Sequence, residues 1–136
     1  MALLSHSNYG SHENASAAKM RHVYKILRAR VPKLEMDGEM QADTAWDGAL
    51  RERIFPNTTL SGRANLFVMP NLDAANITYN MVRVMTDGVA IGPILMGVDK
   101  PAHILTPAST VRRVINMTAI AAVDAQIRAA QSERAS

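Results

Sequence analysis

The pattern of apolar residues constrains this chain most, because its period changes repeatedly from one end to the other. Short runs that suit buried strands alternate with longer stretches in which apolar residues recur every three or four positions, as on a helix face. This alternation is typical of an α/β fold with a mainly parallel sheet rather than a helical bundle or a β-sandwich. A length of 136 residues suits one such domain and is too short for two.

Four segments are predicted to form strands, at 2–5, around Gly38, at 64–69 and at 89–96. The run 64–69 does not alternate, so we expect a central strand covered on both faces, whereas Gly92 and Pro93 place 89–96 at an edge or a kink. A small sheet of this kind has unpaired edges, and its first strand would start at residue 2. We therefore expect the back part of a larger protein, or a chain that completes its sheet in an assembly.

Four helices are predicted between and after these strands, at 17–31, 42–50, 74–85 and 111–130. Ser16 is expected to cap the first helix, which Pro32 ends, and Ser109 or Thr110 to cap the last. The third helix is expected to close at Asp87 and Gly88. Apolar residues surround most of the last helix, so we expect it to be buried or to form a subunit contact.

Composition excludes several classes of protein. The chain has no Cys, which rules out disulfides, Cys-ligated zinc and thiolate nucleophiles and fits a cytoplasmic location. No apolar run approaches the ~20 residues of a membrane-spanning helix, and the first residues lack the features of a secretory signal. The net charge is only +3, but charges are segregated in the first half of the chain, with a basic segment at 19–33 followed by an acidic one at 35–47. With six aromatic residues in all, this favours a solvated helix face beside an acidic element over a nucleic-acid partner.

Sequence motifs for common chemistries are absent. There is no GxGxxG, GxxxxGK[ST] or GxSxG, and the four His have no metal-ligand spacing. Glu35, Asp37 and Glu39 could supply an acid/base pair or a magnesium site, but a structural role opposite the basic helix is favoured.

The loop 5–11 is a better candidate, because it follows a strand and leads to a helix N-terminus, where backbone N–H groups favour anions. Residues 70–76 and 100–101 would join it at the carboxyl edge of the sheet. An anionic, phosphate-bearing ligand is one interpretation, and an ordinary polar loop is the other.

Five blocks of sequence, in this order and spacing, resemble the carboxyl-terminal part of phosphate acetyl/butyryl transferases. They are residues 5–11, 36–43, 69–77, 91–97 and 100–101. The nearest resemblance is to the phosphotransacetylase-like region that ends hybrid-type NADP-dependent malic enzymes. It implies a three-layer α/β/α sandwich that is part of a two-lobed fold, with 1–92 in the second lobe and 93–136 as a segment and helix returning to the first. NADP and a divalent metal would then belong to other domains of the parent enzyme.

The chain departs from the active family where the resemblance places its chemistry. Active members have a Ser-Arg pair followed by an acidic residue, whereas this sequence has Thr106, Pro107 and Arg113. Pro107 carries no cation for an acyl phosphate, and a guanidinium cannot act as a base near neutral pH. Tyr9 and Asn80 also stand where active members have Lys. The resemblance therefore implies no catalytic residue in this chain.

What the resemblance leaves in place is the rim of a ligand cleft. The residues expected to contact acetyl-CoA or CoA are Ser7, Gly10, Asn71, Asn76, Tyr79 and Thr106. The favoured function is an acetyl-CoA-binding regulatory and oligomerisation module of a malic enzyme, which converts malate to pyruvate and CO2, with homo-oligomers as assemblies. The alternatives are an active phosphate acetyltransferase, moving acetyl groups between acetyl phosphate and CoA, and a structural module with an empty cleft.

Overall fold

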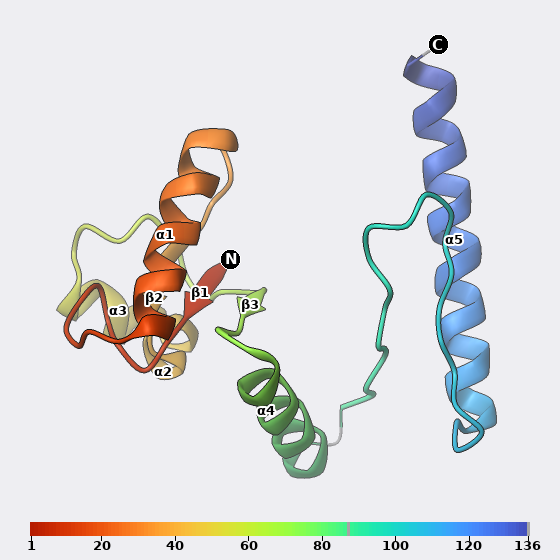
Figure 1. Ribbon diagram of the computed structural model, residues 1–136, viewed down its shortest axis with the longest axis horizontal. Helices are drawn as coiled ribbons and strands as arrows, with labels where there is room; N and C mark the ends of the chain where they lie inside the picture. Colours follow the sequence, from red (N-terminus) through yellow and green to blue (C-terminus); the bar gives the residue numbers. More distant parts are fainter. Residues whose placement is uncertain (87, 136) are drawn as a thin grey trace. The chain divides into compact units, whose positions relative to one another are not determined.

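The computed structural model describes residues 1–86 and 88–135 and divides into two units, Met1–Val84 and Met85–Ser136 (Figure 1). The first unit contains a three-stranded parallel sheet in the order β2-β1-β3. Its strands are β1 (Ala2–Leu4), β2 (Asp37–Met40) and β3 (Phe67–Val68). The predicted α/β class with a parallel sheet is confirmed.

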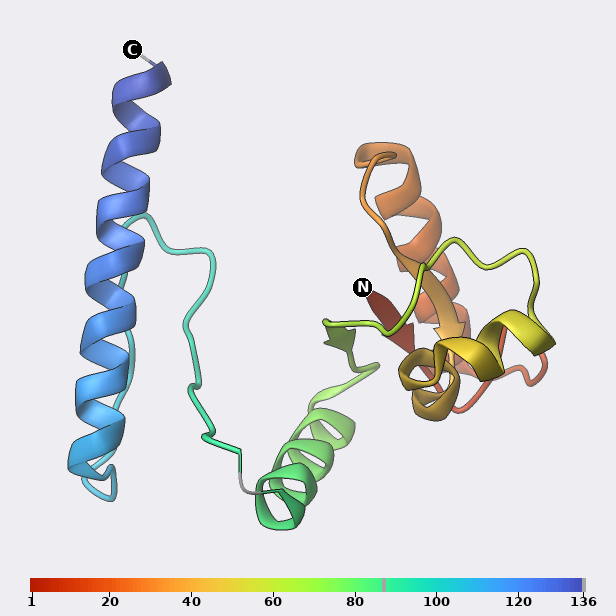
Figure 2. The ribbon, with the colours of Figure 1, turned by 180° about the vertical axis from the view of Figure 1, so that it is seen from behind.

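Helices cover both faces of this sheet. Helix α1 (Ala15–Arg30) packs against β1 and β2, and the short helix α2 (Ala42–Trp46) contacts β1. The two opposite views show α1 in front of the sheet in Figure 1, and α2 with α3 (Gly48–Ile54) in front of it in Figure 2. The first unit therefore has three layers, as the resemblance implied.

The hydrophobic core lies around β1, whose three residues are all buried. One cluster of buried residues joins the strands to α2 and to the chain before β3, and consists of Ala2, Leu4, Met40, Ala45, Leu60 and Ala64. Burial of such side chains stabilises a fold by about 1.5–3 kcal/mol for each large one. The central position that the sequence suggested for 64–69 belongs instead to β1, because β3 is short, half-buried and an outer strand.

The predicted strand at 89–96 is also wrong. Within the described residues, 88–98 form no strand and run as irregular chain with a cis Gly92–Pro93 peptide. Pro93 lacks an N–H to donate to a sheet, and no strand of the described chain pairs with this stretch. The alternative placement at a kink is the part of the expectation that agrees with the structure.

The predicted helix at 42–50 is divided in two at Asp47. Helix α2 ends there and α3 begins, and the Asp47 carboxylate accepts a hydrogen bond of 3.0 Å from the backbone N–H of Leu50. Asp is among the strongest N-cap residues, so a carboxylate in the middle of an apolar period starts a new helix rather than continuing the old one.

The start of α1 also differs from the expectation, since Asn14 and not Ser16 is its N-cap. The Asn14 Oδ1 atom accepts hydrogen bonds from the backbone N–H of Ala17 at 2.8 Å and from the Ser16 hydroxyl at 3.0 Å. The end before Pro32 is confirmed, and Arg28 and Arg30 in the last turn suit the negative end of the helix dipole.

Replacing Asn14 with alanine is expected to lower the free energy of unfolding by about 1 kcal/mol, because the N–H of Ala17 loses its partner. Urea denaturation followed by circular dichroism measures this change. Ser16→Ala is the matched control, since the Ser16 hydroxyl only donates to the cap, and it is expected to cost less than about 0.5 kcal/mol. Equal losses in the two variants would contradict the assignment of the cap.

Helix α4 (Leu72–Met85) confirms the predicted third helix, and Asp87 of its expected closure lies outside the described residues. No residue of α4 is buried, and its apolar side chains, such as Ile77 and Met81, are exposed. The apolar pattern that predicted a packed face therefore finds no cover within the first unit.

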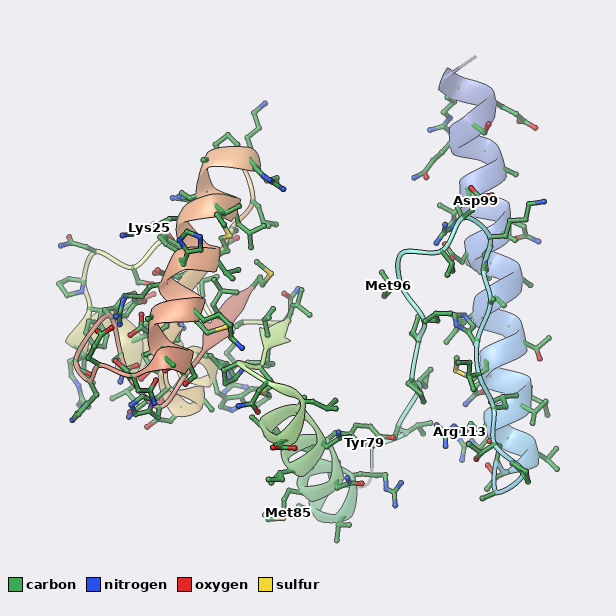
Figure 3. All side chains as sticks on the ribbon, in the orientation of Figure 1. Lys25, Tyr79, Met85, Met96, Asp99 and Arg113 are labelled. Carbon is green, nitrogen blue, oxygen red and sulfur yellow. The ribbon has the colours of Figure 1, made fainter. Side chains whose placement is uncertain are left out.

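The second unit consists of α5 (Val111–Ala135) and the chain that precedes it. Thr110 caps this helix, since its hydroxyl accepts from the N–H of Arg113 at 3.2 Å, as expected. Two arginine side chains of α5 hold the preceding segment: Arg113 donates to the Gly92 carbonyl at 2.6 Å, and Arg128 donates to the Val98 carbonyl at 2.8 Å. Figure 3 shows the segment beside the helix.

The lengths of helix and segment agree. Fifteen residues of helix rise about 22 Å, which an extended chain of six or seven residues can span. Most of α5 is exposed in the described chain, with Met117 buried, so burial of the whole helix is not observed, and the alternative of a subunit contact stays a prediction. No helix in residues 1–86 and 88–135 is long and apolar enough to cross a membrane.

Candidate functional site

The loop after β1 is held by hydrogen bonds to residues at the end of β2 and directly after it. Asn8 and Gln41 pair through two hydrogen bonds: the Gln41 N–H donates to Asn8 Oδ1 at 2.7 Å, and Asn8 Nδ2 donates to Gln41 Oε1 at 3.0 Å. Gln41 Nε2 also donates to the carbonyl of His6 at 2.8 Å. Two blocks that lie far apart in the sequence, 5–11 and 36–43, are therefore one structural unit at the carboxyl edge of the sheet.

Glu39 is the centre of this unit, and its side chain is fully buried. One carboxylate oxygen, Oε1, accepts three hydrogen bonds, from Ser7 Oγ at 2.8 Å, the Gly10 N–H at 2.9 Å and Arg21 Nη1 at 2.9 Å. Arg21 projects from the basic helix α1 and also pairs with Glu13. Partial burial works against the charged Arg21, but its hydrogen bonds to the two carboxylates outweigh this and raise its pKa. The predicted structural role opposite the basic helix is confirmed for Glu39.

The two neighbouring carboxylates are occupied elsewhere. Asp37 accepts from the Thr58 hydroxyl at 2.7 Å and from the Thr59 N–H at 2.8 Å. Glu35 accepts from the hydroxyl and the N–H of Ser61, and these hydrogen bonds lower its pKa. Among the residues that the structure describes, no three His, Asp or Glu side chains gather as a metal site would require. The arrangement suits the fixing of loops rather than magnesium binding.

Tyr9, at which the resemblance implies a Lys in active members, turns its hydroxyl away from solvent. Its ring packs on Phe55 with centroids 4.5 Å apart, and burial raises the pKa of its phenol. Its backbone has a φ of +48°, in the left-handed region that non-glycine residues seldom adopt. This side chain therefore brings no charge to the carboxyl edge of the sheet.

A pocket of about 370 Å³ opens at the carboxyl ends of β1 and β3. Its lining comes from β1 and its loop, from the first residues of α1 and α2, and from the start of α4: Leu4, Ser5, His6, Asn14, Ser16, Ala42, Met69, Pro70 and Ala74. The N-terminal ends of α1 and α4 both reach it, and such ends carry partial positive charge. The pocket therefore offers hydroxyl and amide groups to an anion together with an apolar floor.

The structure brings together only part of the predicted cleft. Ser7 and Gly10 meet at Glu39 rather than facing the pocket. Asn71 caps α4 by accepting from the N–H of Ala74 at 2.9 Å, and Asn76 and Tyr79 lie exposed on that helix. Thr106 belongs to the second unit. The role of these six residues toward a ligand stays a prediction.

Ser5 and His6 of the pocket belong to the loop 5–11 that the sequence predicted, whereas Asn14 was not selected from the sequence. Ser5 Oγ lies 3.4 Å from His6 Nδ1, and Asn14 Nδ2 lies 3.4 Å from the same nitrogen, so these side chains form one polar wall. The signal that could have found Asn14 is position, because this residue directly precedes a helix that follows the same loop. Residues at such points face the carboxyl edge of a parallel sheet.

Thr106, Pro107 and Arg113, three of the positions at which the resemblance implies a departure from active members, lie in the second unit. The Thr106 carbonyl accepts from the Ser109 N–H at 2.9 Å, which folds 106–109 into a turn that holds Pro107. Arg113, labelled in Figure 3 at the start of α5, donates a hydrogen bond from its guanidinium to the Gly92 carbonyl. Neither Pro107 nor Arg113 offers a group that could take a proton.

The sequence matches the family model of phosphate acetyl/butaryl transferases over residues 1–122. The chain belongs to the phosphate acetyl/butaryl transferase family. A EutD phosphotransacetylase from Staphylococcus aureus, whose structure is known, superposes with a TM-score of 0.82 at 34% identity over 91% of this chain and 39% of the other. The family membership and the fold predicted from the five sequence blocks are thus confirmed.

The chain is similar in sequence to two kinds of protein, malic enzymes and phosphate acetyltransferases. The NADP-dependent malic enzyme of Escherichia coli (strain K12) is 51% identical over 127 residues, which is 93% of this chain and 17% of that protein. A phosphate acetyltransferase from Paracoccus denitrificans is 46% identical over 123 residues, 90% of this chain and 39% of that protein. The similarity to the malic enzymes falls in their C-terminal part. This chain thus spans well under half the length of either relative.

Proposed function

We propose that this chain is the phosphotransacetylase-like region of an NADP-dependent malic enzyme, that it binds acetyl-CoA, and that it has lost transferase chemistry. Binding would regulate the conversion of malate to pyruvate and CO2 by the parent enzyme, in a homo-oligomer joined in part by α5. The observation that carries the proposal is Arg113, whose guanidinium stands at the position of the expected acid and donates to the Gly92 carbonyl.

Acyl transfer between acetyl phosphate and CoA needs a cation for the phosphate and a base for the thiol. Pro107 supplies no charge, and Arg113 cannot accept a proton. Loss of an electrostatic partner and of a general base each lowers a rate by about 100-fold or more. Both losses together leave a pocket that can hold a thioester without acting on it.

Binding is supported by the first unit. Its pocket combines polar groups from Ser5, His6 and Asn14 with two helix N-terminal ends, which suits the phosphate groups of a CoA ligand. The six cleft residues predicted from the sequence would complete the ligand contacts. NADP and the divalent metal are proposed for other domains of the parent enzyme, because no dinucleotide motif or metal cluster is present in the described chain.

The test is the malic enzyme rate of the full gene product, measured against acetyl-CoA concentration. We expect acetyl-CoA to change the rate, since a ligand that binds two conformations unequally shifts their populations. Deletion of the present 136 residues should abolish the response. Because deletion could also disturb assembly, Ser5→Asp is the point variant: its added negative charge in the pocket should weaken the acetyl-CoA response about tenfold. An unchanged response in both variants would contradict the proposal.

The similarity to the phosphate acetyltransferase of Paracoccus denitrificans favours a second candidate, an active transferase. That function would require a cation and a base from residues other than Pro107 and Arg113. Turnover of acetyl phosphate and CoA separates the two candidates, because regulation alone needs no turnover.

A further inference from the structure

Glu39 is buried but does not line the pocket at the carboxyl ends of β1 and β3, which we call the strand-end pocket. Its two carboxylate oxygens differ in their hydrogen bonds. Its Oε1 accepts three hydrogen bonds while Oε2, also buried, has no hydrogen-bond partner within the described part of the chain. A buried carboxylate is costly unless its partners compensate it. In the described chain, every hydrogen bond to this side chain comes from the loop after β1 or from Arg21. The stability of the buried carboxylate therefore depends on that loop keeping its present shape.

A chain of hydrogen bonds runs from Glu39 to the pocket. Ser7 Oγ donates to Glu39, the Ser7 N–H donates to Ser5 Oγ at 3.1 Å, and Ser5 Oγ lies 3.4 Å from His6 Nδ1. On the other side of the loop, the His12 N–H donates to Ser7 Oγ at 3.1 Å. Ser7 is thus the junction through which Glu39 reaches two side chains of the pocket wall.

The loop would not hold this shape by local preference. Tyr9 occupies the left-handed region at φ +48°, which costs a non-glycine residue about 1 kcal/mol or more. The bonds on either side of it offset this cost, because the Tyr9 N–H donates to the Glu39 carbonyl at 2.8 Å and the Gly10 N–H donates to the Glu39 carboxylate. Both the backbone and the side chain of Glu39 therefore stabilise a strained turn.

We propose that Glu39 is a positioning residue: it fixes Ser5 and His6 at the strand-end pocket and so sets the affinity of that pocket for its anionic ligand without touching it. The identity of the ligand as acetyl-CoA rests on the proposed function. The control of the loop by Glu39 does not.

The test compares Glu39→Gln with Glu52→Gln in the full gene product. Glutamine keeps the shape of Glu39 but loses the charge that three donors share, whereas Glu52 is exposed on α3. Hydrogen–deuterium exchange read by mass spectrometry should show amides of residues 5–12 exchanging about tenfold faster in Glu39→Gln, and a peptide covering 72–85 unchanged. The dissociation constant for acetyl-CoA, from calorimetry, should rise about tenfold. Glu52→Gln should match the wild type in both.

Ser7→Ala is the second variant, because it removes the hydroxyl that donates to Glu39 and accepts from the His12 N–H. The charge of Glu39 and the Ser7 backbone N–H that donates to Ser5 stay in place. It should move exchange and affinity in the same direction as Glu39→Gln. Faster exchange with unchanged acetyl-CoA affinity would overturn the positioning role and leave Glu39 as a purely structural residue. Unchanged exchange in Glu39→Gln would overturn it as well.

If the wild type binds no acetyl-CoA, the proposed function fails, and the positioning role is decided without that ligand. Diethyl pyrocarbonate is then the probe, and mass spectrometry compares its rate of reaction at His6 with that at the exposed His22. We expect the ratio of the two rates to change at least threefold in Glu39→Gln. An unchanged ratio would overturn the proposal.

Discussion

Arg51→Met is expected to lower the free energy of unfolding of the first unit by about 4 kcal/mol or more, enough to unfold a marginal domain. Arg51 is fully buried, and within the described chain it forms no ion pair with a carboxylate. Its guanidinium donates to one hydroxyl and four backbone carbonyls: Thr58 Oγ1 at 3.1 Å, Thr44 at 3.0 Å, Ala45 at 3.3 Å, Leu60 at 3.2 Å and Gly62.

The size of the effect follows from the groups left behind. Methionine fills much of the same volume but donates no hydrogen bond, and each buried acceptor without a partner costs about 1–3 kcal/mol. Arg53→Met is the matched control, because Arg53 is exposed two residues further along α3, and it should change stability by less than about 0.5 kcal/mol. Urea denaturation of both variants checks this. A loss below about 1.5 kcal/mol in Arg51→Met would show that the carbonyls find other partners.

Gly38→Ala is expected to cost about 3 kcal/mol or more, because two independent constraints meet at this residue. A Cβ at Gly38 would lie 2.5 Å from the carbonyl oxygen of Leu3 and 2.9 Å from its Cβ, and the backbone of β1 cannot move aside. The φ of +139° adds conformational strain for any residue with a side chain.

Gly62→Ala separates these two causes. Gly62 also has a positive φ, +65°, but nothing lies within 4 Å of a Cβ built there. It should therefore show the strain alone, about 1–2 kcal/mol. Thermal unfolding of the two variants under the same conditions measures the difference. Equal losses would contradict the close approach of β2 to β1.

Local sequence was enough to predict the elements whose cause is local. The period of apolar residues placed α1, α4 and α5, and the end of α1 before Pro32 and the start of α5 after Thr110 agree with the structure. The choice between Asn14 and Ser16 as N-cap was not decided by residue type, because both side chains can cap a helix. The structure decides between them: α1 begins at Ala15, so Asn14 lies just before the first turn and Ser16 lies within it.

The strand predicted at 89–96 failed only in part for a local reason, the missing N–H of Pro93. A β-strand needs a neighbour with which to pair, and apolar, β-branched residues show only that a segment could pair. In the described chain, β1 and β2 pair with each other and β3 takes the remaining side of β1. No property of 89–96 itself could reveal that this segment has no strand beside it.

The candidate site was predicted in part. The loop 5–11 was identified because it follows a buried strand, and the pocket at the carboxyl edge of the sheet includes its first two residues. The roles of Ser7 and Gly10 depend on Glu39, which lies 32 and 29 residues away, and a glutamate between apolar residues predicts exposure rather than burial. Arg51 escaped the sequence entirely, because its partners are backbone carbonyls that carry no sequence signal.

The most direct measurement of the proposed function is formation of acetyl-CoA from acetyl phosphate and CoA by the full gene product. The phosphate acetyltransferase of Paracoccus denitrificans serves as the positive control. We expect no rate above that of a protein-free sample, because Pro107 lacks a cation and the guanidinium of Arg113 donates to Gly92. A turnover of about 1 s⁻¹ or more, which is in the range of ordinary enzymes, would contradict the loss of transferase chemistry.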